Sequence, residues 1–570
     1  MDALTACDLP QAWAGQAAWT VLDTDFQNGL RFLQVWYAWR QDPQRPHMLH
    51  YVGIADAAHD TDVHTHPVPS HPPSHLEALA GVLLAQCEGS GPGFRRMLFE
   101  GGSVSLTLCT GGTKAMLGEQ TFQADTLFTT APVDRWAAQL LARRCKRGTR
   151  LWITDPHNPL PTQVLGGTPR HALADAGFQW SPENHGCATF NPHWTLRSSR
   201  NKPARTWATP GRCAVIGAGI SGACVAHALA TRGWQVTVFD QEGAPASGAS
   251  GLPVGLVVPH VSADDSPRSR LSRSGSRLLM QHANQLLQRG QDWAPSGVTE
   301  RKSGAPDLWH PYAAWVKPGV LVQALLTHPR IALVGHTQVG KMQSAIAHWN
   351  LLDTNANDLG TFDVVVAANA MDCQRLLKGL EPHSLLEPDL HAKLHALQAV
   401  HGTMCHGTYL ESIPNLPDTP VNGNGCFVPH VPGPNGAQWC VGSTFETDPL
   451  AVADLGAQHR ANLQRLVQLL PAHGAELADT LDRGPVSLWS ATRCVTHDRL
   501  PLVGPVDAAA QAGLWLCVGM GSRGLSFAPV CAELLAARLC GEPLPLESSL
   551  CRSLDAHRVR RTRPAPAGDA

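Results

Sequence analysis

The feature that most constrains the fold is a glycine-rich segment at residues 212–240, RCAVIGAGISGACVAHALATRGWQVTVFD. A short apolar strand runs into Gly217-x-Gly219-x-x-Gly222, and an uncharged helix, a second strand and Asp240 follow in that order. In such a unit the first glycine makes a tight turn, the second lets a pyrophosphate approach, and the third lets the helix pack on the strand. The terminal acid is placed to accept hydrogen bonds from a ribose hydroxyl. The segment predicts a dinucleotide-binding βαβ unit rather than an unrelated glycine turn, and Asp240 disfavours NADP without separating NAD from FAD.

Length and composition bound the remaining possibilities. A chain of 570 residues predicts two to four domains of about 100–200 residues each. A hydrophobic fraction of 43% excludes wholesale disorder, and a net charge of −2 excludes a histone-like polycation. The N-terminus has no basic stretch before an apolar run, and the apolar residues 213–230 are interrupted by glycines, so we expect neither a signal peptide nor a membrane span. The 16 cysteines include no C-x-x-C pair, so we expect a cytoplasmic protein without a metal site.

Three stretches divide the chain. Residues 59–75 form a loop rich in proline and histidine, and residues 191–211 are basic, poorly hydrophobic and typical of a linker. We therefore expect a first domain over residues 1–190, a larger unit over residues 212–547, and a basic tail over residues 548–570. The larger unit is long enough for a nucleotide-binding subdomain and a substrate subdomain.

Three further segments resemble the D-amino-acid-oxidase and glycine-oxidase class of FAD enzymes. Residues 246–259 (ASGASGLPVGLVVP) are a small-residue turn before an apolar strand, and residues 490–504 (SATRCVTHDRLPLVG) place an arginine before a D-x-x-P-x-x-G turn. Residues 514–524 (LWLCVGMGSRG) are a strand that runs into glycines before a helix over residues 525–539. The resemblance implies an α/β FAD domain with an α+β substrate subdomain, in which the second glycine turn returns to the flavin and the helix dipole points at it.

The same resemblance implies particular binding residues. Arg493 matches the arginine with which this class holds a substrate carboxylate, and a guanidinium does so with two parallel hydrogen bonds. Arg523, within the glycine turn, is expected to touch flavin or substrate. The alternative for Arg493 is a surface arginine near a turn. The expected FAD-binding residues are Gly217, Gly219, Gly222, Asp240, Ser250, Gly251, Gly519, Gly521, Ser522 and Gly524.

The resemblance narrows to the family of bacterial bifunctional tRNA 5-methylaminomethyl-2-thiouridine biosynthesis proteins. GWQVTVFD, APASGASG and GMGSRGLSFAPVCAELLAARLCGEPLPL resemble the FAD-dependent half of that family. Residues 21–40, 49–54 and 93–108 resemble its N-terminal domain, which is of the Rossmann-like methyltransferase type. The family removes the carboxymethyl group from 5-carboxymethylaminomethyl-uridine at the tRNA wobble position with FAD. It then methylates the exposed amine with S-adenosylmethionine, so the resemblance implies tRNA as the partner.

The first half departs from that family at the expected S-adenosylmethionine site. The family's turn reads roughly ETGFGTGLNFL, whereas here it reads DTDFQNGLRFL, with Asp25 and Gln27 in place of glycines. Ala55 stands where the ribose acid is expected, residues 111–112 are Gly-Gly instead of Gly-Asp, and the L-D-G-F-A-P segment at residues 127–132 lacks its Asp. These changes predict that methylation is weakened or lost while the apolar residues keep the fold. An intact methyltransferase with a rearranged site is the alternative.

Basic residues are concentrated locally. Of the 44 Lys and Arg residues, 18 lie in four runs, at residues 143–150, 197–205, 268–277 and 552–563, so a nearly neutral protein can present positive surface to tRNA. The alternative is solvated loops and helix ends. The histidines between residues 59 and 75 have no Cys or acid at ligand spacing, so a polar loop is expected there rather than a metal site.

The sequence therefore predicts FAD-dependent conversion of 5-carboxymethylaminomethyl-(2-thio)uridine in tRNA to 5-aminomethyl-(2-thio)uridine. One alternative is a small-molecule glycine or D-amino-acid oxidase with a scaffold N-terminal domain. A non-enzymatic RNA-binding scaffold fits the first domain but not the flavin segments of the second.

Overall fold

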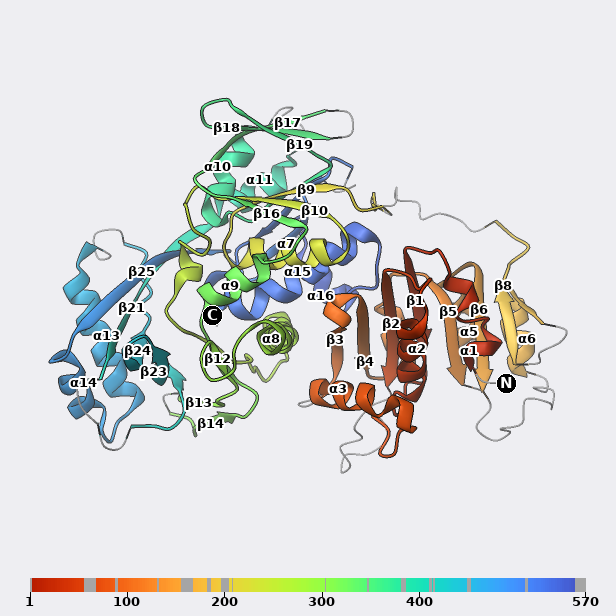
Figure 1. The fold of residues 1–570 in the computed structure, drawn as a ribbon, viewed down its shortest axis with the longest axis horizontal. Helices are drawn as coiled ribbons and strands as arrows, with labels where there is room; N and C mark the ends of the chain where they lie inside the picture. The colour runs from red at the N-terminus through yellow and green to blue at the C-terminus, as the bar shows by residue number, and fades with distance from the viewer. Residues whose placement is uncertain are drawn as a thin grey trace, which may run out of the picture.

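The computed structural model of the chain is shown in Figure 1. The residues it describes are 3–55, 68–87, 91–130, 133–154, 168–181, 186–195, 205–207, 209–302, 304–345, 348–380, 386–409, 413, 416–448, 453–507 and 511–558. The predicted linker and histidine loop, and the basic runs at residues 197–205 and 552–563, therefore lie partly outside the described residues.

The first unit is built on an eight-stranded sheet with the order β3-β4-β2-β1-β5-β6-β8-β7. The central pairs β1–β2, β1–β5, β2–β4 and β5–β6 are parallel. Almost every residue of β2 is buried, as in a parallel sheet covered on both faces. The strands are β1 (Ala18–Asp23), β2 (Met48–Ala55), β3 (Gly93–Phe99), β4 (Val104–Thr110), β5 (Ala124–Thr130), β6 (Cys145–Thr154), β7 (Phe178–Trp180) and β8 (Cys187–Phe190). The helices are α1 (Ala3–Ala6), α2 (Leu30–Gln41), α3 (Glu77–Cys87), α4 (Thr113–Gly118), α5 (Arg135–Ala142) and α6 (Thr168–Asp175).

The second unit begins with the predicted βαβ segment. A six-stranded sheet has the order β16-β10-β9-β20-β27-β26, and all its pairs except β26–β27 are parallel. Its strands are β9 (Arg212–Ile216), β10 (Gln235–Phe239), β16 (Ile331–Val334), β20 (Val364–Ala367), β26 (Leu502–Pro505) and β27 (Leu514–Val518). Helices α7 (Ile220–Thr231), α9 (Pro318–Leu326) and α15 (Gly524–Cys540) pack together with the sheet, and α7 contacts both others. The predicted α/β class and Rossmann-like first domain are confirmed.

A second sheet forms the α+β subdomain at the left of Figure 1. Seven strands run in the order β14-β13-β22-β23-β24-β21-β25, and α13 (Leu455–Leu469) packs on them beside α14 (Gly474–Asp482). The strands are β13 (Val298–Glu300), β14 (Leu308–His310), β21 (Gln398–Thr408), β22 (Val421–Gly423), β23 (Gly425–Gly433), β24 (Gly436–Gly442) and β25 (Val486–Val495). Smaller sheets and helices complete the unit, namely β11 (Gly255–Val257), β12 (Trp293–Ala294), β15 (Ala314–Val316), β17 (Val339–Ser344), β18 (Trp349–Asp353), β19 (Asp358–Phe362), α8 (Pro267–Leu286), α10 (Cys373–Lys378) and α11 (Pro388–His395).

The two units share a buried interface along β3, the edge strand of the first sheet. Gln281 of α8 accepts the backbone N–H of Leu98 (2.9 Å) and donates to the carbonyl of Arg96 (3.1 Å). The helix thereby pairs a strand edge that would otherwise expose unpaired backbone groups. Behind it, the buried Arg232 forms ion pairs with Glu533 (3.0 Å) and Glu542 (2.8 Å). The first unit is thus anchored to α8, and Arg96 of β3 also donates to the Pro543 carbonyl of the second unit.

The predicted tail over residues 548–570 is wrong for its first part. Residues Ser548–Leu554 form helix α16, in which Leu550 and Leu554 are fully buried. Arg558 donates to Asp498 (2.8 Å), so the folded unit extends at least to that residue. The apolar residues recur at helical spacing, but the neighbouring arginines gave the segment the composition of a tail.

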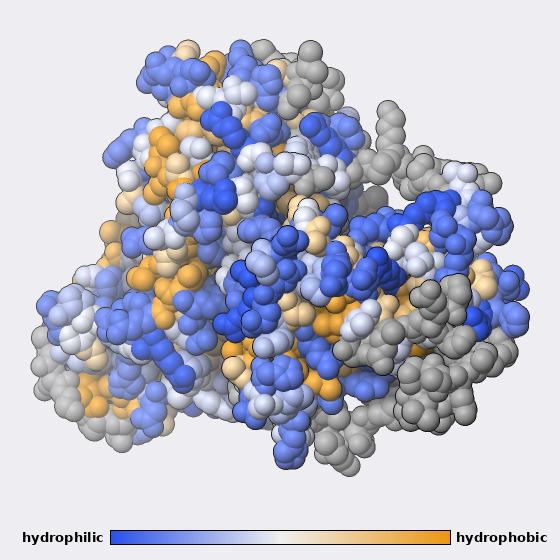
Figure 2. Space-filling model, turned by 45° about the vertical axis from the view of Figure 1, so that its right-hand side comes forward, coloured by the Kyte–Doolittle hydropathy of each residue, from blue (hydrophilic) through white to orange (hydrophobic). Residues whose placement is uncertain are grey.

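Polar side chains cover most of the face shown in Figure 2, and hydrophobic residues form separate patches on it. Over the described residues, no helix combines the length and hydropathy needed to cross a bilayer. Within the same ranges, no three His, Cys, Asp or Glu side chains gather closely enough to hold a metal.

Candidate functional site

A cavity of about 630 Å³ opens where the parallel sheet of the second unit meets the seven-stranded sheet. The carboxyl ends of β9, β10, β20 and β27 form one side, and residues of β21 to β25 form the other. Ligands of open α/β sheets bind at this edge, and the volume is in the range of about 300–1,000 Å³ usual for ligand pockets.

The first glycine turn borders the cavity at the N-terminus of α7. Gly217 has φ +107°, and a Cβ there would lie 2.9 Å from the carbonyl oxygen of Ala368. A Cβ at Gly222 would lie 1.8 Å from the carbonyl oxygen of Gly217, so only glycine lets the helix approach the turn. Gly217 and Gly219 line the cavity, whereas Gly222 lies behind them. The turn therefore keeps side chains away from the first amides of α7, where a pyrophosphate would bind.

Asp240 and Ser250 lie on the same wall, and both bind backbone amides. Asp240 Oδ2 accepts the N–H of Ala218 (2.6 Å), and its other oxygen accepts the N–H two residues further on (2.9 Å). Each carboxylate oxygen has a second lone pair, so a ribose hydroxyl could still donate to it. Ser250 Oγ accepts the N–H of Ile220 at the start of α7 (2.8 Å). Gly251 is outside the lining, and a Cβ there would lie 2.5 Å from a carbonyl oxygen of its own loop.

The second glycine turn follows β27 and borders the cavity on the same side as the first turn. Gly519 and Gly521 have φ of +79° and +58°, and both line the cavity with Ser522 and Gly524. Helix α15 begins at Gly524, so its N-terminal end is at the cavity wall. The two glycine turns, which are about 300 residues apart in sequence, thus meet at one cavity.

Arg493 projects from β25 into this cavity and is partly buried. Its guanidinium donates to Ser443 Oγ (2.5 Å) and the Thr444 carbonyl (3.4 Å), and it lies 4.7 Å from the ring centre of Phe445. Among the described residues, no carboxylate forms an ion pair with Arg493. Burial lowers the pKa of Arg493, because the charged form has lost water. A partly desolvated cation with only neutral partners favours an anionic ligand.

Arg523 lies in the second glycine turn and also lines the cavity. It donates to the Val258 carbonyl (3.4 Å), and burial, followed by the nearby charge of Arg268, lowers its pKa. Glu300 also lines the cavity, where it accepts from His310 (2.9 Å). The cavity thus brings together both arginines proposed from the sequence.

The sequence does not mark the residues that contact Arg493, nor Asn369, a polar residue that also lines the cavity. Ser443, Thr444 and Phe445 are about 50 residues away in sequence, and no motif marks them. Asn369 also lines the cavity after β20, and its buried Oδ1 has no hydrogen-bond partner among the residues that the structure describes. An unpaired buried acceptor beside the glycine turns fits a ligand with donor groups, such as a dinucleotide cofactor.

In the first unit, charged side chains fill the edge where a methyltransferase would bind its cofactor. Asp23, at the end of β1, is fully buried and accepts from the Tyr51 hydroxyl (2.6 Å). Arg31 of α2 lies 3.2 Å from Asp23 Oδ1 and 3.7 Å from Asp25 Oδ2. Burial raises the pKa of Asp23 to about 6, although Arg31 and Tyr51 oppose the shift. Arg31 thus neutralises both acids of the turn from within the protein.

The aromatic residue of that turn is buried as well. Phe26 is 2% exposed, its N–H donates to the Ile54 carbonyl (2.9 Å), and its ring packs edge-on against Tyr51. A Cβ at Gly53 would lie 2.2 Å from the Phe26 ring. Asp25 also accepts from the Gln27 amide (2.7 Å). Asp25 and Gln27, which stand where the family has glycines, are thus hydrogen-bonded to each other, and Asp25 also lies beside Arg31.

Comparison with known proteins first defines the class. The family model described as FAD dependent oxidoreductase matches residues 212–300 and 281–538. The second unit is therefore an FAD-dependent oxidoreductase domain. A glycine oxidase from Geobacillus kaustophilus is similar over 61% of this chain and 99% of its own, with 20% identity and a TM-score of 0.48.

Whole-chain relatives then define the family. The tRNA 5-methylaminomethyl-2-thiouridine biosynthesis bifunctional protein MnmC of Albidiferax ferrireducens is 45% identical over 97% of this chain and 95% of its own. The protein of the same name from Polaromonas naphthalenivorans is 38% identical over 99% and 93%. The chain belongs to this family, as the sequence motifs predicted.

Proposed function

We propose that this protein oxidises the carboxymethylaminomethyl group of a wobble uridine in tRNA, with FAD as the oxidant, in the cytoplasm. The observation that carries the proposal is Arg493, a cation with only neutral partners in a cavity that both glycine turns line. The substrate side chain carries a carboxylate on the carbon that must be oxidised, so this arginine meets its charge requirement.

The glycine turns, Asp240 and Ser250 are the residues proposed to hold FAD. When bound, FAD would accept a hydride from the carbon between the substrate amine and carboxylate. Arg493 would hold the carboxylate with two parallel hydrogen bonds and fix that carbon at the cofactor. Water would then cleave the resulting carbon–nitrogen double bond, which releases glyoxylate and leaves the aminomethyl group on the uridine. Leu256, Val258 and Met404 supply apolar wall that limits water around the reacting carbon.

The protein is further proposed to stop at the aminomethyl product. S-adenosylmethionine needs an acceptor for its ribose and room at the turn, but Ala55 stands where the ribose acid is expected, and the side chains of Asp25 and Gln27 stand where the family has glycines. The first unit would then serve as a support for α8, which it contacts through β3.

Anaerobic mixing of the FAD-loaded protein with tRNA that carries 5-carboxymethylaminomethyl-uridine tests the proposal. Loss of the oxidised flavin absorbance together with aminomethyl-uridine in the digested tRNA supports it. Rapid flavin reduction by glycine or sarcosine, with no reaction on tRNA, would favour the small-molecule oxidase instead.

A further inference from the structure

Phe445 is an exposed aromatic residue in the lining of the cavity that both glycine turns border (the flavin cavity). The lining also contains Phe239 and Trp489. Phe239 is 2% exposed and packs edge-on against Phe362, and Trp489 is half-buried, whereas Phe445 is 56% exposed. Of the large hydrophobic side chains that the described residues expose, only Phe445 lines this cavity.

The backbone on both sides of Phe445 is hydrogen-bonded, so the ring is presented from a fixed place. The Thr444 N–H donates to the Thr403 carbonyl (3.1 Å), and the Thr444 hydroxyl accepts the Thr403 N–H (3.0 Å). On the other side, Glu446 and His401 exchange two backbone hydrogen bonds (3.0 and 2.8 Å). Thr444 is 4% exposed, and successive residues of an extended chain point to opposite sides, so the Phe445 side chain turns outward. A ring held in this way loses little conformational freedom when a ligand binds.

The ring lies beside the arginine proposed to hold the substrate carboxylate. The guanidinium carbon of Arg493 is over the Phe445 ring, 4.7 Å from its centre. In the proposed substrate, four bonds join C5 of the uracil to the carboxylate carbon, and they span about 5 Å when extended. A carboxylate bound at Arg493 therefore brings the uracil ring within reach of Phe445.

An aromatic side chain at this place suits a pyrimidine base. A base stacks on such a ring by its face, and the ring needs no hydrogen-bonding group to bind it. The stacked base would also cover apolar surface that is now in contact with water. A small amino acid such as sarcosine has no ring and would leave Phe445 exposed.

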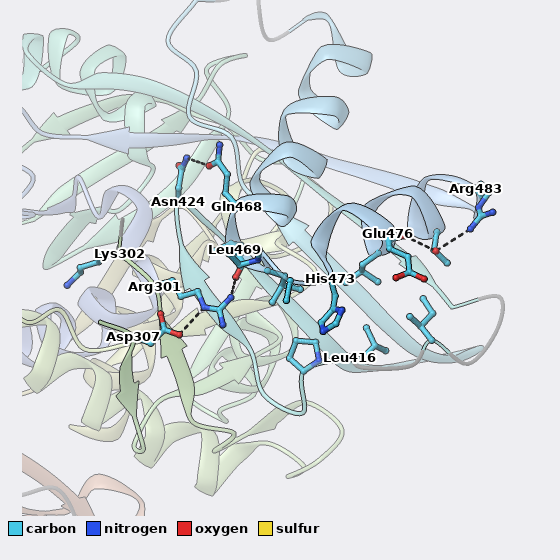
Figure 3. A pocket seen from close by; sticks show the side chains of 17 residues that line it. Arg301, Lys302, Asp307, Leu416, Asn424, Gln468, Leu469, His473, Glu476 and Arg483 are labelled. Carbon is cyan, nitrogen blue, oxygen red and sulfur yellow. Dashed lines mark hydrogen bonds and ion pairs between the residues drawn. The ribbon is translucent and has the colours of Figure 1, made fainter. Parts of the chain in front are cut away.

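A larger cavity, of about 1090 Å³, lies in the α+β subdomain beside α13 and α14 (Figure 3). None of the described residues that line it is Phe, Tyr or Trp. Two of its cations are already paired, Arg301 with Asp307 (3.0 Å) and Lys302 with Glu300 (3.3 Å). The flavin cavity, with its exposed ring, is therefore the better site for a base.

We propose that Phe445 stacks on the uracil ring of the modified nucleotide and thereby determines which substrates the protein accepts. The inference rests on the proposed function, because the same nucleotide must place its carboxylate at Arg493. Phe445 would bind the base, whereas Arg493 would bind the carboxylate. Together they would favour an amino-acid-like group carried on a pyrimidine over the free amino acid.

Anaerobic flavin reduction by an anticodon stem–loop that carries 5-carboxymethylaminomethyl-uridine tests the inference. Phe445→Leu keeps an apolar side chain but removes the ring, and it should lower kcat/KM about 5- to 150-fold, the range for loss of one base–aromatic stack. Phe445→Tyr keeps the ring and should stay within about threefold of the wild type. Because Phe445 is exposed, neither substitution removes core packing.

The matched control is Trp136→Leu, at an aromatic residue of α5 that is 65% exposed and lies outside the cavity lining. It should stay within about twofold of the wild type, as is usual for surface substitutions. Flavin absorbance per protein must be equal in all variants. Phe445→Leu within about twofold of the wild type, or Phe445→Tyr impaired as much as Phe445→Leu, would overturn the inference.

A stem–loop that carries the aminomethyl product separates stacking from an effect that passes through Arg493. This ligand has the base but no carboxylate for the arginine to bind. Its Kd, measured by fluorescence anisotropy, should rise about fivefold or more in Phe445→Leu and stay near the wild-type value in Phe445→Tyr. An unchanged Kd in Phe445→Leu would mean that the ring acts only by positioning Arg493, and it would overturn the inference.

The same measurements separate this inference from the proposed function. A wild-type protein that binds the product stem–loop through Phe445 but never reduces its flavin would overturn the proposed function alone. Oxidation of the modified uridine that is equally fast in Phe445→Leu would overturn the inference alone.

Discussion

Arg493→Lys is expected to leave FAD bound and to slow oxidation of the modified uridine. Lysine keeps the charge but lacks the planar group that now donates to Ser443 (2.5 Å) and lies 4.7 Å from the Phe445 ring. It cannot present two parallel donors to a carboxylate in the same place. Loss of one charge-assisted hydrogen bond costs about 1.5–3 kcal/mol, which is about 10- to 150-fold in kcat/KM at about 1.4 kcal/mol per tenfold.

Anaerobic stopped-flow measurement of flavin reduction at several tRNA concentrations gives the ratio of kcat/KM between the wild type and Arg493→Lys directly. Arg460→Lys, on the surface of α13, is the matched control and should behave as the wild type. Flavin absorbance per protein must be equal in all three proteins for the comparison to hold. A variant within about twofold of the wild type in kcat/KM would refute the assignment of Arg493 to the substrate carboxylate.

Further predictions concern the cofactor turn, the first unit and the interface. Gly219→Val should abolish the flavin absorbance while the protein stays folded, because the valine side chain would occupy the space through which the pyrophosphate approaches the backbone. Gly222→Ala should lower the melting temperature as well as the flavin absorbance, because the alanine Cβ would lie 1.8 Å from the Gly217 carbonyl oxygen. Calorimetry should detect no micromolar binding of S-adenosylmethionine, and methylated product from the purified protein would contradict this. Glu533→Gln should destabilise the fold by about 1.5–3 kcal/mol in thermal or urea unfolding, because the buried Arg232 loses one of its two carboxylate partners and keeps only Glu542. An unchanged midpoint of unfolding would contradict this. Burial lowers the pKa of His50 to about 4, whereas an unfolded histidine titrates near about 6.5. The free energy of unfolding should therefore fall by about 3 kcal/mol between about pH 6.5 and pH 4, because the unfolded chain binds a proton that the folded protein does not. His50→Gln should remove this part of the pH dependence of the free energy of unfolding.

The sequence predicted the elements around the first glycine turn closely. The sequence predicts a strand, a glycine turn, a helix, a second strand and Asp240 in that order, and the structure has β9, the turn, α7 (Ile220–Thr231), β10 (Gln235–Phe239) and Asp240 in that order. Local chemistry decides much of this region, because the positive φ of Gly217 and the 1.8 Å distance from a Cβ at Gly222 to the Gly217 carbonyl oxygen both arise within the unit itself. The position of Arg493 came from the resemblance, and the structure places it in the cavity.

Contacts between distant segments could not be predicted in the same way. Ser443 and Phe445 surround Arg493 only because β24 and β25 both flank β21 in the sheet. The buried pairs of Arg232 join residues about 300 positions apart, and no local pattern marks them. The composition of helix α16 predicts a tail, because its local spacing of apolar residues does not show that Leu550 and Leu554 pack against distant segments.

The most direct test of the account is mass analysis of nucleosides after one anaerobic turnover on tRNA that carries 5-carboxymethylaminomethyl-uridine, with S-adenosylmethionine present. The account predicts one aminomethyl-uridine for each flavin reduced, and no methylaminomethyl-uridine. Unchanged nucleoside with oxidised flavin would contradict the proposed oxidation, and methylaminomethyl-uridine would contradict the proposed loss of methylation.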